Sequence, residues 1–562
     1  MSQSTFSRFQ QVSFFDRLYS LSDKQIRKLE NGWPGTFKNE ILPKLAELEI
    51  YFSPLYSENS NSRPSTPTYL VLAFFLLKDL FGMTDDQLVE AVHFNIEFQY
   101  ALGTTSLSDQ PINQRTLNRF RAAVSMYEKK TGIDLMEIYF YGMADRFVEE
   151  FVVSKRMRRM DSILIDNGCR KLSRLQTAHA VIRNALDLLE EEQKPIQQSL
   201  HHYIEDFDEN KVTYHDHRPA QVKQEEAFRD ALSLYNDYPE DLKDSEEYLL
   251  LERFVNEQID RTEDGKFLAV REGKKLTSTT LNNPVEPEST IRTKAGETHQ
   301  GYIGNFAETV DLETNRKIID SASFQQNIYS DSRFAKDEIV RMAQSGNTDS
   351  LVVDGAYSSV DNVNLAAEKG IQLLGTDLAG NDTPDLYADF KIDVEQKTVI
   401  CPYGRRADRV SVDKKDDSIF SVSFLKKECS ECPYQNNCPL KEHKRVRSGK
   451  VSNKMIQRAN LQRSMNSEEY KKIRCFRNGV EAIPSQLRRN QNLDHMPYKG
   501  FVRKKLGYWM SLLAINVRRV LQYRQEDHKK GLQAGIVSLI YALFVIFFEK
   551  SQTNQTQIKV TQ

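Results

Sequence analysis

At 562 residues, 39% of them hydrophobic, the chain is long enough for about three or four domains with packed cores. Its first residues, MSQSTFSRFQ, lack the apolar core of a secretion signal, so we expect a cytoplasmic protein. The apolar run 536–548 is shorter than the ~20 residues of a membrane span, so we expect no membrane contact and a buried helix or strand for that run. The net charge of −2 conceals an acidic stretch around 203–263 and a basic stretch at 441–505, which would suit a polyanion, although basic runs are often only solvated surface.

The chain from about residue 14 to residue 130 predicts an all-helical region. Apolar residues recur at helical spacing, most clearly in TYLVLAFFLLKDLFGMTDDQLVEAVHF, where Thr84 resembles an N-cap with a capping box. The segment INQRTLNRFRAAV adds Arg115, Arg119 and Arg121 to another helical pattern. This region could therefore contact phosphates, although charged helix surfaces are common without such a role.

A short strand is predicted next. The basic residues SKRMRRM are followed by MDSILIDNG, a β-branched run that opens with Asp161 and closes at a turn beside Asp166. From 172 to about 276 the chain again has helical spacing and high charge, with no apolar strand pattern until Gly301. We therefore expect a helical insertion after this strand.

Strand signals then return in a definite order. GYIGNFAETVDL and KIIDSASFQQ flank the turn residues 313–316 as in a hairpin, and a helix is predicted at 333–345. A buried-type strand, SLVVD, ends in Asp354 and is followed by a helix at 360–369 and a strand, IQLLGT. Strand, hairpin, helix, strand, helix, strand is a mixed α/β order, and it is the order of an RNase H-like core.

Four of the six cysteines fall within one later region, a pattern that favours a metal site over a disulfide scaffold. Three of them form CxxCxxxxxC, and with the fourth, in CPYG, they make a plausible four-thiolate Zn²⁺ site. His443 could replace one thiolate, and reduced cysteines without metal are the alternative. The four candidate ligands are Cys401, Cys429, Cys432 and Cys438.

Two aspartates end or open strands of the predicted sheet. Ligands gather at strand ends in such sheets, which makes Asp161 and Asp354 candidates for metal binding, although an acid at a strand end is usually a cap or turn residue. Phosphoryl transfer requires carboxylates that hold two divalent ions, and Mg²⁺ prefers such oxygen ligands. Asp166 is a rival for the first position. Strand alternation puts it on the opposite face, and we favour Asp161.

A third carboxylate, Glu481, is expected on a helix at about 473–489. At ~100° per residue it shares a narrow arc with several basic residues, whereas Val480 and Leu487 point the opposite way. The alternative is an ion-paired surface stripe. Pro484 predicts a kink, and the arc would lose its first two arginines if the helix began near this proline. The arginines of the arc are Arg474, Arg477 and Arg488.

Three segments resemble those of DDE transposases of bacterial insertion sequences, particularly the group with a helical N-terminal domain and a cysteine-rich insert. MDSILIDN is similar to that family's first-aspartate strand, LVVDGAYSS to its second and RNGVEAIPSQLRR to its glutamate helix, and the resemblance covers about residues 10–525. Arg477 and Glu481 match the helix pattern, but Arg474 stands where Tyr is expected and Arg488 where Lys is expected. PVEPEST also replaces an aspartate-rich turn before the hairpin.

The resemblance implies an endonuclease and polynucleotidyl transferase that cleaves the ends of an insertion sequence and joins them to target DNA. Asp161, Asp354 and Glu481 would hold Mg²⁺ or Mn²⁺ for hydrolysis by an activated water and for attack by the freed 3′-hydroxyl. The partners would be the terminal inverted repeats, target DNA and a second copy of the chain, because pairing two ends generally needs at least a dimer. The expected phosphate-binding residues are Arg474, Arg477 and Arg488.

Two other functions stay open at this point. An RNase H-like nuclease that cuts without joining strands would use the same carboxylates. A domesticated transposase would act as a DNA-binding regulator, and its expected mark is the loss of a carboxylate. All three candidates are present, which favours an enzyme.

We therefore expect an α/β protein built on an RNase H-like core of the retroviral-integrase type. The expected parts are a helical N-terminal DNA-binding domain (1–155), the first part of the core (156–171), a helical insertion (172–295), the second part of the core (296–395), a cysteine-rich zinc-type insert (396–450), the glutamate helix with the C-terminal part of the core (451–525), and a tail (526–562).

Overall fold

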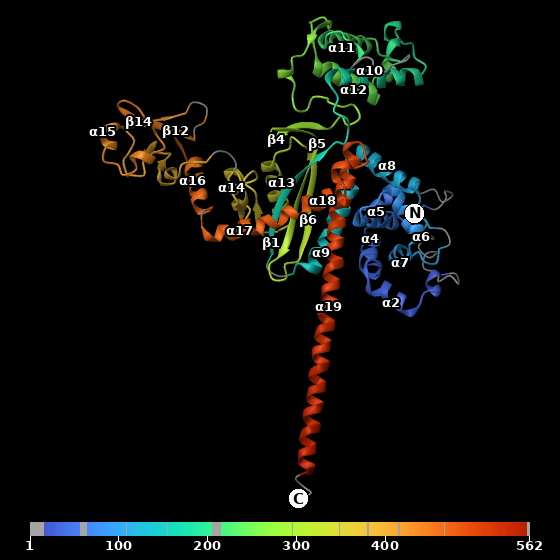
Figure 1. The fold of residues 1–562 in the computed structure, drawn as a ribbon. Coiled ribbons are helices and arrows are strands. Elements are labelled where there is room, and N and C mark those ends of the chain that lie inside the picture. Colours follow the sequence, from blue (N-terminus) through green and yellow to red (C-terminus); the bar gives the residue numbers. More distant parts are fainter. Residues whose placement is uncertain are drawn as a thin grey trace.

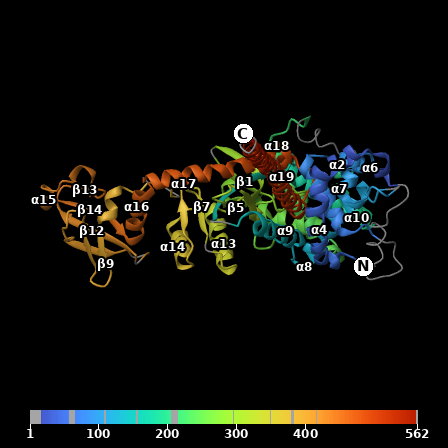
Figure 2. The ribbon, with the colours of Figure 1, turned by 90° about the horizontal axis from the view of Figure 1, so that it is seen from below.

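A mixed β-sheet forms the centre of the molecule in the computed structural model. The N-terminal helices and the cysteine-bearing module lie at opposite ends of this sheet, and the helical insertion lies beyond one end of its strands (Figures 1 and 2). The structure describes residues 16–558 apart from 57–64, 108–109, 154–155, 205–214, 295, 348, 379–381, 414–415, 417 and 466.

The sheet has the strand order expected of an RNase H-like core. It runs β4–β5–β1–β7–β8, and β6 also pairs with β5. The β1, β5 and β6 strands are antiparallel neighbours, whereas β7 and β8 continue parallel to β1, which confirms the predicted mixed order. The strands are β1 (Arg156–Asp166), β4 (Thr290–Lys294), β5 (Glu297–Asp311), β6 (Lys317–Gln326), β7 (Ser350–Val353) and β8 (Leu373–Gly375).

Helices cover both faces of this sheet, and the alternation of β1 decides which residues meet which helices. Met160 packs with α13 (Asp331–Gln344) and α14 (Val360–Glu368), at the two positions where helices were predicted. Ile163 and Ile165 pack on the other face, against α9 and α19. Asp161 shares their parity, so its side chain belongs to the face of α19.

A glycine allows α19 to lie close to the sheet. A Cβ on Gly304 of β5 would lie 2.6 Å from the ring of Tyr508 of α19, so no larger residue fits there. The hydroxyl of Tyr508 donates a hydrogen bond to the carbonyl oxygen of Asn305 (2.8 Å). This contact holds the helix on the face that bears Asp161.

The N-terminal region is helical, as predicted, and Thr84 makes the expected capping box with Gln87. Its apolar residues belong to the same hydrophobic cluster as one face of the sheet and α19, so the expected boundary after residue 155 divides residues that share one core. Its helices are α2 (Asp23–Asn31), α3 (Trp33–Thr36), α4 (Leu42–Leu48), α5 (Thr68–Phe81), α6 (Asp85–Phe94), α7 (Ile96–Leu102), α8 (Gln114–Thr131) and α9 (Leu135–Phe151).

The first strand is longer than expected. It begins at Arg156, so Asp161 lies in the middle of β1 and not at its start. The basic residues before Asp161 are buried in ion pairs: Arg158 contacts Asp320 (3.0 Å) and Glu338 (2.8 Å). Acidic residues far along the chain thus neutralise the basic residues of β1 and allow them to be buried, although the local sequence predicts a solvated segment.

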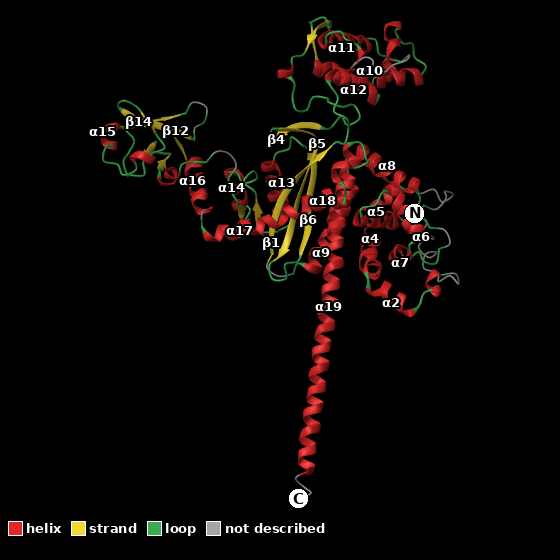
Figure 3. Ribbon diagram, viewed as in Figure 1, coloured by secondary structure: helices red, strands yellow, loops and turns green. Residues whose placement is uncertain are grey.

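The insertion is mainly helical and has a core of its own. Its helices are α10 (Arg174–Glu191), α11 (Ala220–Asn236) and α12 (Glu246–Gln258). The insertion also contains strands that the apolar pattern did not predict: β2 (Ile259–Arg261) and β3 (Phe267–Val270) form a small hairpin, and β4 pairs with β5 (Figure 3). These strands are short and partly exposed, so they carry little of the apolar pattern that sequence reading relies on.

The four candidate zinc ligands lie in a small module with a separate core. A four-stranded antiparallel sheet, β11–β12–β14–β13, forms most of it, and α16 packs against this sheet. Its elements are β9 (Lys391–Asp393), β10 (Thr398–Ile400), β11 (Arg409–Val412), β12 (Ile419–Leu425), α15 (Lys426–Cys429), β13 (Lys441–Glu442), β14 (Val446–Ser452) and α16 (Asn453–Met465).

The predicted glutamate helix is divided into three parts: α17 (Glu468–Asn478), the 3₁₀ turn η10 (Gly479–Glu481) and α18 (Ala482–Asn490). Pro484 lies in the first turn of α18, so the helix begins near this proline, as the alternative reading expected. The interruption lies at η10, which contains Val480, the residue whose carbonyl oxygen a proline at 484 leaves without an N–H partner.

The last helix, α19 (Phe501–Ile558), is much longer than the pattern that predicted it, and it extends away from the rest of the molecule in Figure 1. The expected boundary at 525 falls inside it. The side chains of the apolar run 536–548 lie outside the described residues, so their expected burial is not tested. None of the helices in the described ranges combines the length and apolar character that crossing a bilayer takes.

Candidate active site

The register of two parallel strands relates Asp161 to Asp354. Arg159 of β1 pairs with Val352 of β7, the last pair between the two strands. Continuing this register by two residues brings Asp161 level with Asp354, which directly follows β7, and the charge of Asp354 acts on the carboxyl group of Asp161. Paired residues of neighbouring strands face the same side of a sheet. The two aspartates thus come from positions far apart in the sequence to one face and one level of the sheet.

Arg477 joins Asp161 to Glu481. Its guanidinium contacts Asp161 Oδ2 (3.0 Å) and Glu481 Oε1 (2.6 Å). The side chains of Asp161 and Arg477 are 17% and 12% exposed, whereas that of Glu481 is 58% exposed. Two of the three predicted carboxylates therefore share one cationic partner at the edge of the protein surface.

Asp354 is exposed, and its connections run through the loop after β8. The backbone N–H of Gly355 donates to Asp354 Oδ1 (2.8 Å), and the hydroxyl of Thr376 donates to the same oxygen (3.4 Å). The carbonyl oxygen of Thr376 in turn accepts a hydrogen bond from Arg474 Nε (3.1 Å). Arg474 thus reaches the loop beside the second aspartate.

The pKa of Asp161 depends on its burial and on the charged groups around it. Burial raises the pKa of its carboxyl group; Arg477 and the backbone N–H of Ser162 lower it, and the charges of Asp354 and Glu481 raise it again. Burial is the largest of these effects, so the net pKa of Asp161 is above its usual value even with Arg477 beside it. Among the described residues, no group of three or more His, Cys, Asp or Glu side chains stands in a geometry that could hold a metal ion.

The other predicted residues have different surroundings. Arg488 is exposed and pairs with Asp494 (3.1 Å), away from the carboxylates. Asp166 is exposed at the end of β1, where its Oδ1 accepts a hydrogen bond from the backbone N–H of Gly168 (2.7 Å) in a turn. Arg121, which the helical pattern offered for phosphate contact, is buried.

Arg121 instead belongs to a charged cluster between the N-terminal helices and the segment before α19. It forms a two-pronged ion pair with Asp85 (2.6 and 2.8 Å) and donates to the hydroxyl of Tyr498 (3.3 Å). Lys78 donates to the same hydroxyl (2.8 Å). The partners of Arg121 lie on other elements, so its helix pattern alone gave no signal of this role.

The four cysteines of the predicted zinc site line one small cavity of about 30 Å³. All four are free thiols. Burial raises the pKa of Cys429, Arg447 lowers it, and the other three thiols raise it further. The structure brings the cysteines together without arranging them as ligands. His443 does not line this cavity.

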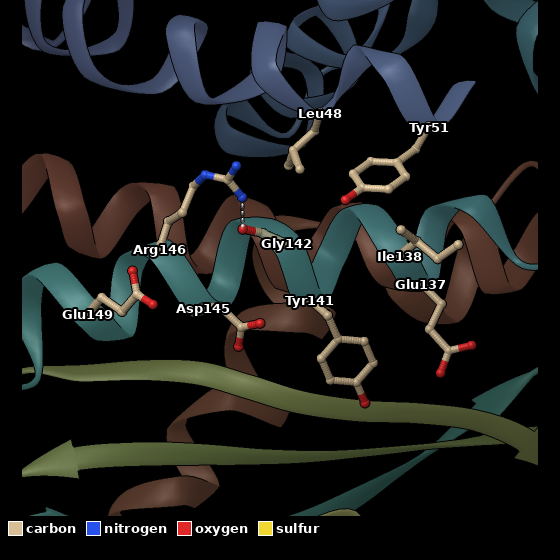
Figure 4. Close-up of a pocket in the computed structure, with 9 residues that line it drawn as sticks. All are labelled: Leu48, Tyr51, Glu137, Ile138, Tyr141, Gly142, Asp145, Arg146 and Glu149. Atoms are coloured by element: carbon tan, nitrogen blue, oxygen red, sulfur yellow. Dashed lines mark hydrogen bonds between the residues drawn. The ribbon is translucent and has the colours of Figure 1, made fainter. Parts of the chain in front are cut away.

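A separate pocket lies among the N-terminal helices, with α9 along one side (Figure 4). Leu48 and Tyr51 line one wall, and α9 provides the other, with Arg146 donating to the carbonyl oxygen of Gly142 (2.7 Å). The three candidate carboxylates are not among its lining residues. It is therefore a feature distinct from the candidate active site.

Comparison with known families connects this geometry to a class of enzymes. Residues 400–521, which include Glu481 and the four cysteines, match the family model described as the transposase DDE domain. Residues 36–123, within the N-terminal helices, match the model of a transposase domain (DUF772). No curated protein and no solved structure matches the chain. The two matches, on either side of an RNase H-like sheet whose face collects distant carboxylates, identify the chain as a DDE transposase of the insertion-sequence type.

Proposed function

We propose that this DNA transposase cleaves the ends of an insertion sequence and joins them to target DNA with Asp161, Asp354 and Glu481 as its metal-binding carboxylates. The observation that carries the proposal is the pair of contacts that Arg477 makes with Asp161 and Glu481, together with the strand register that relates Asp161 to Asp354.

The residues fit a divalent cation in their chemistry. Carboxylate oxygens are the ligands that Mg²⁺ and Mn²⁺ prefer. The charges of Asp354 and Glu481 both act on the carboxyl group of Asp161 and raise its pKa. The guanidinium of Arg477 supplies such charge between two of the acids. When bound, a pair of divalent ions would activate the attacking oxygen and stabilise the leaving oxygen.

The chain's own side chains would orient the DNA around these acids. Arg477 is held by two carboxylates, so it would present a fixed guanidinium to a phosphate near the scissile bond. Arg474 and Arg488 are exposed on the same helical segment and would contact phosphates to either side. Phosphate contacts position DNA without reading its sequence.

The experiment compares Asp161→Asn, Asp354→Asn and Glu481→Gln in the full chain. The substrate is a plasmid that carries the DNA flanking the gene, incubated with Mg²⁺. We expect each variant to lose end cleavage while it still binds the DNA. The control is Asp166→Asn, which keeps the turn hydrogen bond of an exposed residue and should cleave normally.

Two outcomes would count against the proposal. Undiminished cleavage by any one of the three variants would remove that residue from the active site. Cleavage without any joined product in a second, target plasmid would favour a nuclease that does not transfer strands, and DNA binding without cleavage by the wild type would favour a regulator.

We also propose that the cysteine-rich insert binds one structural Zn²⁺ through Cys401, Cys429, Cys432 and Cys438. Four thiols around one small cavity are a suitable donor set, because Zn²⁺ takes four thiolates in closed structural sites. A metal there would brace the module that precedes the glutamate segment. It would take no part in the reaction.

The working assembly and the division of the chain are proposals as well. Because two DNA ends must be paired, we propose a homodimer on DNA, acting in the cytoplasm where the chromosome lies. The domain boundaries given above are proposed as functional parts, with the N-terminal region, 1–155, as the part that recognises the ends.

A further inference from the structure

The basic residue two positions before Asp161 has a distinctive set of contacts. Arg159 lies on the same face of β1 as Asp161 and is only 6% exposed. Its register partner on β5 is Glu308, which is completely buried and accepts a hydrogen bond from Arg159 Nε (2.6 Å). Arg519 of α19 also pairs with Glu308 (2.9 Å). The guanidinium of Arg159 is therefore fixed from the sheet side.

The charge state of Glu308 depends on the two arginines that contact it. Burial alone would raise the pKa of Glu308, but Arg519 and Arg159 hold it below its usual range. Glu308 is thus ionised, and a buried ionised pair with several hydrogen bonds is costly to break. Arg159 has little freedom to move.

The free end of the same guanidinium reaches the segment that carries Glu481. Arg159 Nη1 donates to the carbonyl oxygen of Phe476 (2.5 Å), in the last turn of α17, and the guanidinium lies 5.0 Å from the Phe476 ring. The same carbonyl oxygen also accepts a hydrogen bond from the backbone N–H of Gly479, and a cation near the last carbonyls of a helix is favoured by the helix dipole. Arg159 therefore binds the C-terminal end of α17.

Gly479 lies directly against this guanidinium. A Cβ on Gly479 would lie 2.6 Å from Arg159 Cζ, closer than the 3.0 Å that real Cβ atoms observe. The backbone of Gly479 has φ −63° and ψ −19°, which any residue adopts. Glycine costs a helix about 1 kcal/mol relative to alanine, so the contact with Arg159, and not the backbone, accounts for its presence.

We propose that Arg159 is a positioning residue for Glu481, holding the turn that carries this carboxylate at a set distance from the strand that carries Asp161, with Gly479 as the surface on which its guanidinium rests. The inference rests on the proposed role of Glu481. Gly479 is two residues from Glu481 in the same 3₁₀ turn, so a shift of one moves the other. Glu481 is exposed and pairs with Arg477, whose backbone belongs to the last turn of α17, the turn that Arg159 contacts.

The test is a double-mutant cycle of Gly479→Ala and Arg159→Lys in the full chain. Lysine keeps a charge beside Glu308 but has no planar fork to reach Glu308 and Phe476 at once. We measure end cleavage of the flanking-DNA plasmid as a function of Mg²⁺ concentration. Each single variant should need about 10- to 100-fold more Mg²⁺ or cleave 10- to 100-fold more slowly, the usual effect of losing a partner that orients a metal ligand.

The double variant should be no worse than the poorer single variant, because both changes disrupt one contact. The control is Gly273→Ala, the same substitution at a glycine with nothing within 4 Å of its Cβ position. It should leave the Mg²⁺ dependence unchanged. DNA-end binding and thermal unfolding of each variant are measured in parallel. Wild-type values in both measurements would show that the variant is folded and that its defect comes from the position of Glu481.

Wild-type Mg²⁺ dependence in Gly479→Ala, or effects that multiply in the double variant, would overturn the inference. The Glu481→Gln variant distinguishes a failure of the positioning role of Arg159 from a failure of the proposed active site. If Glu481→Gln is inactive while Gly479→Ala behaves as wild type, only the positioning role is wrong. If Glu481→Gln cleaves normally, the proposed active site is wrong.

Discussion

The contacts of Arg477 predict that this residue competes with divalent ions for the acids of the site. Its guanidinium lies 3.0 Å from Asp161 and 2.6 Å from Glu481. A unit-charge pair at 3.0 Å is worth about 5 kcal/mol at an effective dielectric constant of about 20, and about 1.4 kcal/mol in bulk water. Asp161 is partly exposed, so the true value lies between these limits.

Replacing Arg477 by Met should therefore tighten metal binding to the DNA-free protein. The lower limit of about 1.4 kcal/mol corresponds to about a tenfold gain in affinity. The same variant should cleave DNA ends more slowly, because it has lost a phosphate-binding guanidinium. Few changes strengthen metal binding and weaken the reaction together, which makes the combination diagnostic.

The assay is Mn²⁺ binding followed by electron paramagnetic resonance at pH 8, with no DNA present. Arg488→Met is the matched control, because Arg488 lies on the adjoining helix, is 51% exposed and pairs with Asp494 instead of the candidate acids. Its Mn²⁺ affinity should equal that of the wild type. Equal or weaker Mn²⁺ binding by Arg477→Met would refute the reasoning, since it would mean that the guanidinium does not occupy the place of a metal.

Three further predictions concern stability and the zinc site. Burial raises the pKa of Asp79 from 3.8 to about 6 despite nearby Lys78, so the stability that the protonated carboxyl group contributes is present below pH 4 and is lost as the pH rises through 6. Asp79→Asn should therefore raise the free energy of unfolding by up to about 3 kcal/mol at pH 7.5 but not near pH 4. A lower unfolding midpoint of this variant at both pH values would contradict the prediction. Leu487→Ala in the completely buried face of α18 should cost about 2–5 kcal/mol in thermal unfolding, whereas Arg488→Ala should cost less than about 0.5 kcal/mol. Protein from zinc-supplemented cells should contain zinc by mass spectrometry and lose it in Cys432→Ser, and a zinc-free wild type would exclude the site.

Local pattern was sufficient for much of the central sheet. The hairpin, the strand SLVVD and the helices between the strands follow from the spacing of apolar residues, because a buried strand must be apolar and a half-buried helix must repeat near 3.6 residues. The same reasoning placed Asp354 at a strand end and separated Asp161 from Asp166 by alternation. The acids could thus be nominated from the sequence.

The contacts that fix the site depend on residues far apart in the chain, and no local pattern encodes them. Arg158 and Arg159 read as a solvated basic run, yet they lie inside β1 because Asp320, Glu338 and Glu308 come from other elements to neutralise them. A charge can be buried only when a partner meets it, and only the folded chain decides which partners meet.

The same limit applies to the segment of Glu481. From the sequence by itself we could predict a helical segment with charged residues on one face and apolar residues on the other, and the order along the chain of the strands that carry the two aspartates. The tertiary structure decided that a 3₁₀ turn, Gly479–Glu481, interrupts the helical segment, and that the guanidinium of Arg159 lies against Gly479 there. It also decided that Arg477 lies between two of the acids, since that requires β1 and η10 to pack against each other, and packing between distant elements is set by the whole core and not by any one segment.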